Sequence, residues 1–203
     1  MKFIIYSLIG IFLMGCTGMP FSNTSIDPKT VYKIEQATMI SPDQANWVLM
    51  HNQIHSLVLA KKFDDNNQTA LITTMMYPAG THKTSRAFLE FVISERSKND
   101  DKNRFKNLNV KNEFVSFKDL PCFKYQTLAE DHKDKGMTST DFEYFKTEGY
   151  ICRYPLEYIA FQFEISHRSK DKQMPAEISK VGQLFFENIQ VVKGTIKRLK
   201  TIP

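Results

Sequence analysis

Two cysteine-bearing segments place the strongest limits on how this chain folds. Residues 121–129 and 142–152 each have the composition of a β-strand, and a polar, glycine-containing stretch separates them. In an antiparallel hairpin that sets Cys122 opposite Cys152, Phe123 faces Ile151 and Tyr125 faces Gly149. That register gives the hairpin one apolar and one polar face, as a half-buried sheet requires. We therefore expect the two cysteines to be direct cross-strand neighbours.

The next strand along the chain has the clearest alternation in the sequence. Ile159, Phe161, Phe163 and Ile165 occupy every second position, with Ala160, Gln162 and Glu164 between them. If its apolar face continues that of the hairpin, Phe161 lies opposite Ile151 and Phe163 lies opposite Gly149, where the ring fills the space of the missing side chain.

The remaining pattern predicts an α+β fold with an antiparallel sheet of about six strands covered by two to three helices. Strands are predicted over residues 31–35 and 108–118, and a hairpin joins 55–63 to 69–77 through a polar turn. Ser41, Pro42 and Gln44 resemble a helix start, which predicts a short helix through Met50. Apolar spacing predicts two more helices, over 84–97 and from Pro175 onward. With 42% hydrophobic and 24% charged residues, one domain over 31–192 is expected.

This arrangement of helices on an antiparallel sheet loosely resembles the fold group that includes Mog1, PsbP and DcrB. The resemblance rests on the order of the predicted elements and on no diagnostic motif. It implies a shape and no chemistry.

The N-terminus begins with a single charge, Lys2, followed by an uncharged apolar run over residues 3–14. Twelve helical residues span about 18 Å, which is too short for a hydrocarbon core of about 30 Å. The run therefore predicts an export signal rather than a membrane span.

The run ends in Leu13-Met14-Gly15-Cys16, which resembles the lipobox of bacterial lipoproteins. The resemblance implies cleavage of a signal peptide over 1–15 and lipidation of Cys16 through its sulfur, with palmitate-type acyl chains anchoring the protein in a membrane. Thr17 stands where an aspartate retains such lipoproteins in the inner membrane, so the periplasmic face of the outer membrane is implied. An ordinary signal peptide, or an anchor with an incidental cysteine, is the alternative.

Residues 16–30 are rich in turn-forming types and predict a tether. Export into an oxidising periplasm favours a disulfide between Cys122 and Cys152. A catalytic thiol pair is the alternative, but such pairs usually take a Cys-x-x-Cys spacing, which the sequence lacks.

Charge is uneven along the chain. Removal of residues 1–15 takes away only Lys2 and leaves 26 basic and 22 acidic residues. The tail over 193–203 carries four bases and no acid, which suits contact with anionic lipid or an acidic partner, or a solvated terminus. Nucleic acid is not an expected partner, because no zinc-finger spacing or RNA-binding aromatic motif is present.

A small-anion site is predicted between Thr81 and Arg86, at the start of the second predicted helix. His82, Lys83 and Arg86 lie beside helical N–H groups that are free to bind a phosphate or carboxylate. Ordinary capping by Thr84 or Ser85 is the alternative.

The other histidines predict no site. His51 and His55 have ligand spacing without the glutamate of a His-Glu-x-x-His motif, so no metal is expected there. The acidic stretch over 130–134 contains a lysine among its ligand types and is expected to be a solvated loop. For His167 and Arg168, a structural ion pair is expected.

No catalytic residue or cofactor is predicted, because nucleophile-elbow and phosphate-loop patterns are missing from the sequence. The leading hypothesis is a non-catalytic, lipid-anchored module that binds or assembles another envelope protein. The rival is an envelope enzyme or small-anion carrier with its site near Thr81 to Arg86.

Overall fold

The computed structural model describes residues 25–64, 67–133, 137–154 and 158–192. The predicted signal peptide, Cys16 and the tail over 193–203 lie outside these residues. The elements in chain order are β1 (Val31–Ile34), β2 (Ala37–Ile40), β3 (Trp47–Gln53), β4 (Ser56–Lys61), β5 (Thr69–Pro78), α1 (Ser85–Asn99), β6 (Phe105–Phe117), β7 (Leu120–Asp131), β8 (Glu143–Arg153), β9 (Ile159–Ser169), α2 (Ala176–Glu187) and β10 (Gln190–Val191). The predicted α+β class is confirmed.

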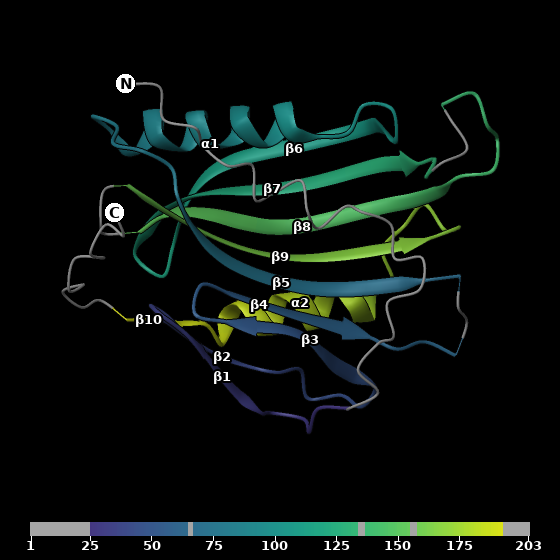
Figure 1. Cartoon of the computed structure of the whole chain (residues 1–203), viewed down its shortest axis with the longest axis horizontal. Helices are drawn as coiled ribbons and strands as arrows, with labels where there is room; N and C mark the ends of the chain where they lie inside the picture. Colours follow the sequence, from purple (N-terminus) through teal and green to yellow (C-terminus); the bar gives the residue numbers. More distant parts are fainter. Residues whose placement is uncertain (1–24, 65–66, 134–136, 155–157, 193–203) are drawn as a thin grey trace, which may run out of the picture.

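A seven-stranded antiparallel sheet in the order β3-β4-β5-β9-β8-β7-β6 forms the centre of the molecule, and β1, β2 and β10 form a second, three-stranded sheet. The helices α1 and α2 lie on opposite sides of the large sheet (Figure 1). In the described part of the chain, no helix is long and apolar enough to cross a membrane.

The cysteine hairpin has the predicted register. Strands β7 and β8 pair with Cys122 opposite Cys152, Phe123 opposite Ile151 and Tyr125 opposite Gly149. The two cysteines form a disulfide, and both are fully buried. A cross-link over 30 residues of chain contributes about 3–4 kcal/mol in the chain-entropy model.

The predicted register of the following strand is wrong by one residue. Phe161 lies opposite Cys152, and Phe163 lies opposite Tyr150. The prediction assumed a single apolar face, whereas both faces of this sheet are covered by a helix. Phe161 and Phe163 pack toward α2, while Ile151 packs toward α1. Glu164 stands opposite Gly149, where an added Cβ would lie 2.4 Å from the carbonyl oxygen of Phe163.

The helix predicted over 41–50 is wrong, because the segment forms a loop and then β3. Ser41 does not begin a helix: its hydroxyl accepts from the Thr30 N–H at 2.8 Å and so holds the loop to the preceding turn. Asn46 has a left-handed backbone with φ 68°, which interrupts any helix. Trp47 and Val48 follow it, and both are fully buried although successive strand residues point to opposite faces.

The other predicted elements are confirmed within a few residues. Antiparallel pairing joins β4 to β5, and α1 and α2 cover the two predicted helical segments. Thr84 caps α1 by accepting the Ala87 N–H at 3.1 Å. Gly182 lets α2 approach β9 closely, since a Cβ there would lie 2.5 Å from a side-chain carbon of Ile165.

Candidate functional site

An open groove of about 540 Å³ lies where the loop before α1 meets the end of β8 and the β6–β7 turn. It contains part of the predicted anion site, so we take it as the candidate site. Its lining residues come from these three segments: Thr81, His82, Lys83, Ser85, Asp119, Leu120, Pro121, Arg153 and Tyr154.

Local sequence explains why these segments meet. Gly80 has φ 77° and lets the chain turn sharply before α1. Lys118 and Asp119 both have a left-handed backbone, which is the geometry of a two-residue hairpin turn between β6 and β7. Across the groove, the disulfide joins the residue after Pro121 to the residue before Arg153.

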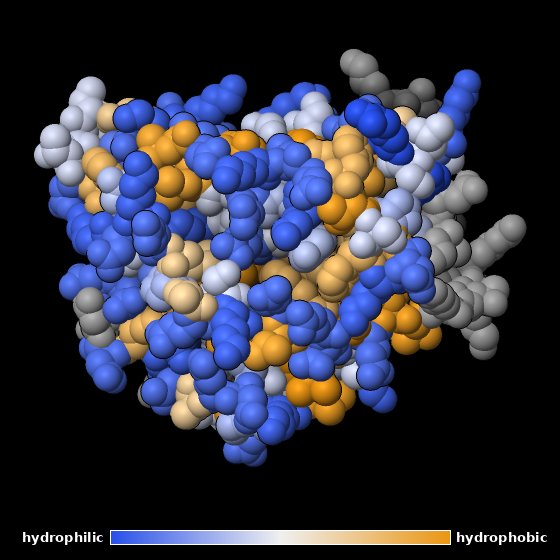
Figure 2. All heavy atoms as spheres, turned by 180° about the vertical axis from the view of Figure 1, so that it is seen from behind, coloured by the Kyte–Doolittle hydropathy of each residue, from blue (hydrophilic) through white to orange (hydrophobic). Residues whose placement is uncertain are grey.

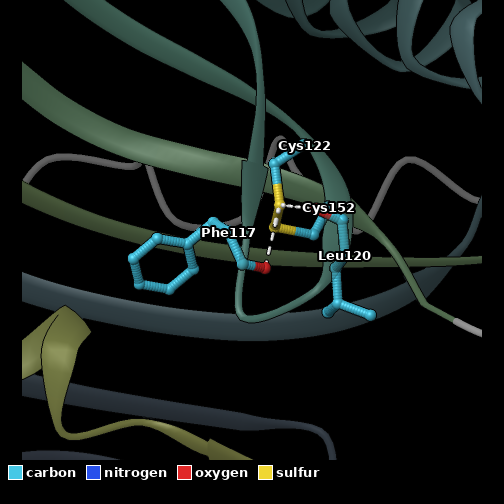
Figure 3. Close-up of a disulfide and its surroundings, with 4 residues drawn as sticks. All are labelled: Phe117, Leu120, Cys122 and Cys152. Carbon is cyan, nitrogen blue, oxygen red and sulfur yellow. Dashed lines mark hydrogen bonds between the residues drawn. A yellow bond between two sulfur atoms is a disulfide. The ribbon is translucent and has the colours of Figure 1, made fainter.

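Figure 3 shows the disulfide beside Phe117 and Leu120, at the base of the β6–β7 turn. Cys122 and Cys152 belong to the core cluster that packs under α2, together with Leu120. The groove therefore has one wall that is covalently tied to the centre of the sheet.

Arg153 is the cation most firmly held in the groove. Its guanidinium donates to the Ser85 hydroxyl at 3.3 Å and to the His82 carbonyl oxygen at 3.1 Å. The same group lies 5.5 Å from the centre of the Phe88 ring, in a cation–π contact. These contacts fix Arg153 at the start of α1. Sequence reasoning missed this residue because it lies far along the chain from Thr81 to Arg86.

The three residues predicted to bind an anion have different surroundings. His82 and Lys83 line the groove. The His82 ring contacts the Ala79 carbonyl oxygen through Nε2 at 3.1 Å and packs against Phe91, with ring centres 4.7 Å apart. Arg86 is not among the lining residues: it pairs with Glu90 at 2.9 Å and lies 4.5 Å from the Phe114 ring centre.

The groove is electrostatically mixed. Lys83 and Arg153 supply positive charge, Asp119 supplies negative charge, and Thr81, Ser85 and Tyr154 supply hydroxyl groups. The Tyr154 hydroxyl donates to the Gln36 side-chain oxygen at 2.9 Å and so ties the groove to the small sheet. This set of side chains can bind an anionic or hydroxylated ligand. The Ser85 hydroxyl accepts from Arg153 and is held by a cation rather than by a general base.

The other sequence candidates have structural partners. His51 and His55 do not form a site: His51 contacts the Ser56 hydroxyl at 2.7 Å, and His55 pairs with Glu35 at 3.2 Å. Among the residues that the structure describes, no three His, Cys, Asp or Glu side chains are placed to hold a metal ion.

The loop predicted to be solvated over 130–134 instead carries a buried ion pair. Asp131 has a fully buried side chain that pairs with both Arg104 and Arg168 at 2.8 Å. Burial raises the pKa of Asp131, but the Arg104 hydrogen bond and the two arginine charges outweigh it and leave that pKa below its usual value. The structural ion pair expected for His167 and Arg168 is therefore confirmed for Arg168 but is wrong for His167, whose lowered pKa leaves it uncharged at pH 7.

Two buried bases lie opposite each other on β8 and β9. Lys146 faces His167, and its ammonium donates to the Ser169 hydroxyl at 2.8 Å. Burial lowers the pKa of Lys146 to about 8. Burial and the neighbouring Lys146 charge lower the pKa of His167 to about 4, so this histidine is neutral at pH 7.

The sequence matches no protein-family model and no curated protein. Solved structures that resemble the chain include the Ran-binding protein Mog1p of Saccharomyces cerevisiae, with a TM-score of 0.46 and 11% identity over 85% of this chain and 96% of that one. Another is the solution structure of cyanobacterial PsbP from Synechocystis sp. PCC 6803, with a TM-score of 0.46 and 7% identity over 87% of this chain and 99% of that one.

A mutant of Mog1 also resembles the chain, with a TM-score of 0.47 and 11% identity over 80% of this chain and 96% of that one. Mog1 and PsbP are both members of the fold group that the order of the predicted helices and strands resembles. Because the TM-scores lie below one half and the identities are low, these neighbours carry no argument about function.

Proposed function

We propose that this protein is a lipoprotein of the bacterial envelope, anchored through Cys16 at the periplasmic face of the outer membrane, where it acts as a non-catalytic binding or assembly module. The observation that carries the proposal is the buried disulfide between Cys122 and Cys152, in a chain whose residues 13–16 resemble a lipobox. Disulfides persist in the periplasm and are rare in the cytosol, so the core and the leader favour the same compartment.

The three cysteines divide into two roles under this proposal. Cys122 and Cys152 are fully buried and bonded to each other. Cys16 is then the one thiol left for acylation. Two or more acyl chains hold a protein stably in a membrane without any contribution from the folded domain.

The length of chain before the fold limits how far the domain can lie from the membrane. The first described residue, Ser25, already pairs with Val48 beside β3, and the Ile26 N–H donates to the Trp47 carbonyl oxygen at 2.9 Å. Eight residues, and so nine Cα-to-Cα steps, separate Cys16 from Ser25. At about 3.4 Å per residue they reach roughly 30 Å, so a lipidated Cys16 holds the domain close to the bilayer.

Metabolic labelling with a palmitate analogue tests the anchor. We expect the wild-type chain to be labelled and to fractionate with membranes, and the Cys16→Ser variant to lose both properties. The double variant Cys122→Ser, Cys152→Ser is the matched control and should keep the label. An unlabelled wild-type chain would contradict the proposal.

Cross-linking in intact cells tests the binding role. We expect an envelope component that is recovered reproducibly with the wild-type chain and lost with Cys16→Ser, because the anchor places the domain beside its partner. Recovery of the same species with both chains, or of none with either, would contradict the assembly role while leaving the anchor test unaffected.

The groove favours a second candidate, a small-anion carrier or envelope enzyme with its site near Thr81 to Arg86. Lys83 and Arg153 lie together in that groove of about 540 Å³. Calorimetric titration with phosphate and with citrate tests it, with Lys83→Gln against Lys180→Gln, an exposed position on α2. This candidate predicts roughly tenfold weaker binding for Lys83→Gln alone. Equal binding by the two variants would exclude it.

A further inference from the structure

The strand β6 forms one edge of the large sheet and has unusual exposure. It is 13 residues long, and residues 106–114 are all exposed. Within the described residues it pairs with β7 alone. The opposite edge differs: β3 has seven residues, and Ser25 bridges to Val48 along its outer side. An edge of this length that no described residue covers presents a row of N–H and C=O groups to another strand.

Apolar side chains accompany this open backbone. Val110 is 49% exposed and Phe114 is 40% exposed. Phe114 lies opposite Phe123, which packs toward α1, and Val110 lies four residues away on the same strand face. Figure 2, which views the molecule from behind, shows that apolar side chains also reach the surface on that side, in patches among hydrophilic ones.

The charges on β6 define how two copies of it would pair. Every second residue of an edge strand directs its N–H and C=O groups outward. When two identical strands pair in antiparallel fashion, a two-fold axis relates them, and one residue at this axis lies opposite the same residue of the second copy. If that residue is Asn112, Lys111 lies opposite Glu113 of the second copy, and the reverse pair forms on the other side of the axis. Val110 then lies opposite Phe114 of the second copy.

The two adjacent registers bring like charges together. An axis beside Lys111 sets two lysines against each other, and an axis beside Glu113 sets two glutamates against each other, which is destabilising for directly opposed residues. Among the described residues, Lys111 stands opposite the uncharged Gln126 of β7 and Glu113 stands opposite Lys124, with no ion pair within 4 Å at either position. Opposite charges and apolar contacts thus coincide in one register only.

We propose that β6 is a self-association surface, through which two copies of this chain pair edge to edge around Asn112 and join their large sheets into one. The occupant is a second copy because the strand is complementary to itself in charge and in apolar pattern. The proposal does not depend on the lipid anchor. Confinement to a membrane would raise the local concentration and strengthen the pairing.

Cysteine cross-linking of the full chain tests the register. Asn112→Cys places the introduced thiols opposite each other across the axis, at the separation of direct cross-strand neighbours. After mild oxidation in a non-denaturing detergent, we expect a reducible dimer whose linked peptides both contain position 112. Gln183→Cys, at an exposed position on α2, is the matched control and should remain monomeric.

Charge exchange on the cysteine variant tests the contacts. Lys111→Glu alone or Glu113→Lys alone creates like-charged pairs and should lower the dimer yield by about tenfold. The double exchange restores opposite charges across the axis and should restore the yield. Sedimentation of the wild-type chain should show the dimer without cross-linking.

Three outcomes would overturn the proposal. These are equal cross-linking at positions 112 and 183, no recovery of yield in the double exchange, or cross-linking of position 112 to a different protein instead of a second copy.

Discussion

The two faces of the large sheet are built on different principles, although they share the same strands. On β9, Phe161, Phe163 and Ile165 enter the large apolar cluster under α2. The residues between them face α1, and they are small or polar. The α2 face is filled by close-packed rings, whereas the α1 face combines a smaller apolar cluster, which includes Phe88, Phe123 and Ile151, with a network of side-chain hydrogen bonds.

The polar face contains a continuous chain of side-chain hydrogen bonds. The Tyr125 hydroxyl donates to Glu164 at 2.7 Å, and Arg96 of α1 donates to the same carboxylate oxygen at 2.9 Å. Gln162 links Tyr125 to Tyr77 in turn. The Arg96 guanidinium also lies 4.0 Å from the Tyr125 ring centre. Arg96 thus ties α1 to β7 and β9, and the hydrogen bonds of Gln162 extend this network to Tyr77 on β5.

Removal of a ring from the apolar face should have the largest effect. Phe163 is almost fully buried, and its ring contacts those of Tyr150, Phe161 and Phe186. We expect Phe163→Ala to lower the free energy of unfolding by about 3–5 kcal/mol, measured by urea denaturation. The neighbouring change on the other face, Gln162→Ala, should cost about 1 kcal/mol. Similar losses for the two variants would contradict the contrast between the faces.

Loss of the disulfide should come next. The double variant Cys122→Ala, Cys152→Ala is expected to lose about 3–4 kcal/mol, because the unfolded chain regains the freedom that the cross-link removes. Urea denaturation of the oxidised wild type and the variant gives the difference. A loss below about 1 kcal/mol would mean that the unfolded chain is already restricted in the reduced state.

Acidification should weaken the end of the α2 face. The folded-state pKa of His167 is about 4, below its ordinary value, so between pH 6.5 and 4 the unfolded chain binds more protons at this group. The contribution of neutral His167 to the free energy of unfolding is therefore fully present above pH 6.5 and is lost as the pH falls toward 4. We expect a loss of roughly 2 kcal/mol at pH 5 relative to pH 7.

Two variants separate the histidine from other acid effects. His167→Gln should remove most of this pH dependence in urea denaturation. Lys146→Met removes the cation opposite His167, which should raise the histidine pKa and reduce the acid sensitivity. An unchanged profile in both variants would assign the acid response to other groups.

Disruption of the hydrogen-bond network on the α1 face should lower the free energy of unfolding by a smaller amount. Arg96→Ala leaves the Glu164 carboxylate without its cation and should cost roughly 1–2 kcal/mol. Addition of Glu164→Gln should recover part of this loss, since no carboxylate is then left unpaired. Hydrogen exchange of α1 amides is the second readout and should accelerate in Arg96→Ala. Additive losses in the double variant would argue against the pairing.

The helix cap should give the smallest change. Thr84→Ala removes the acceptor for the Ala87 N–H and should cost about 1 kcal/mol or less, with fraying confined to the start of α1. Ser97→Ala, near the other end of the same helix, is the control and should change stability less.

The same contrast between faces explains what could be predicted from the sequence. The register of β7 on β8 was predictable because two cysteines and several apolar pairs agree on one alignment. The register of β9 on β8 was not predictable, because residues on both faces of the sheet are buried. Alternation alone does not show toward which helix the aromatic residues of β9 point. The loop before β3 contains a helix-start pattern, but burial of Trp47 and Val48 in the sheet overrides it.

Only the part of the candidate site that is contiguous in sequence was predicted. His82 and Lys83 stand next to the start of α1 and were predicted from that position alone. Arg153 comes from another strand, and nothing near it in the sequence indicates that it contacts Ser85. Asp131 was predicted to be solvated because neither of its partners is close in sequence. Arg104 lies 27 residues before it, and Arg168 lies two strands later in the chain order, on β9. Contacts of this kind depend on strand order.

The disulfide also affects what proteolysis can do to this protein. Every peptide bond between Cys122 and Cys152 lies inside a covalent ring, including the β7–β8 connection at the tip of the hairpin. A single cut there opens the ring but releases nothing, because the two fragments stay joined through sulfur and through the strands on either side. Such a cut would be invisible on a gel run without reductant, and the chain would separate into two pieces only after reduction.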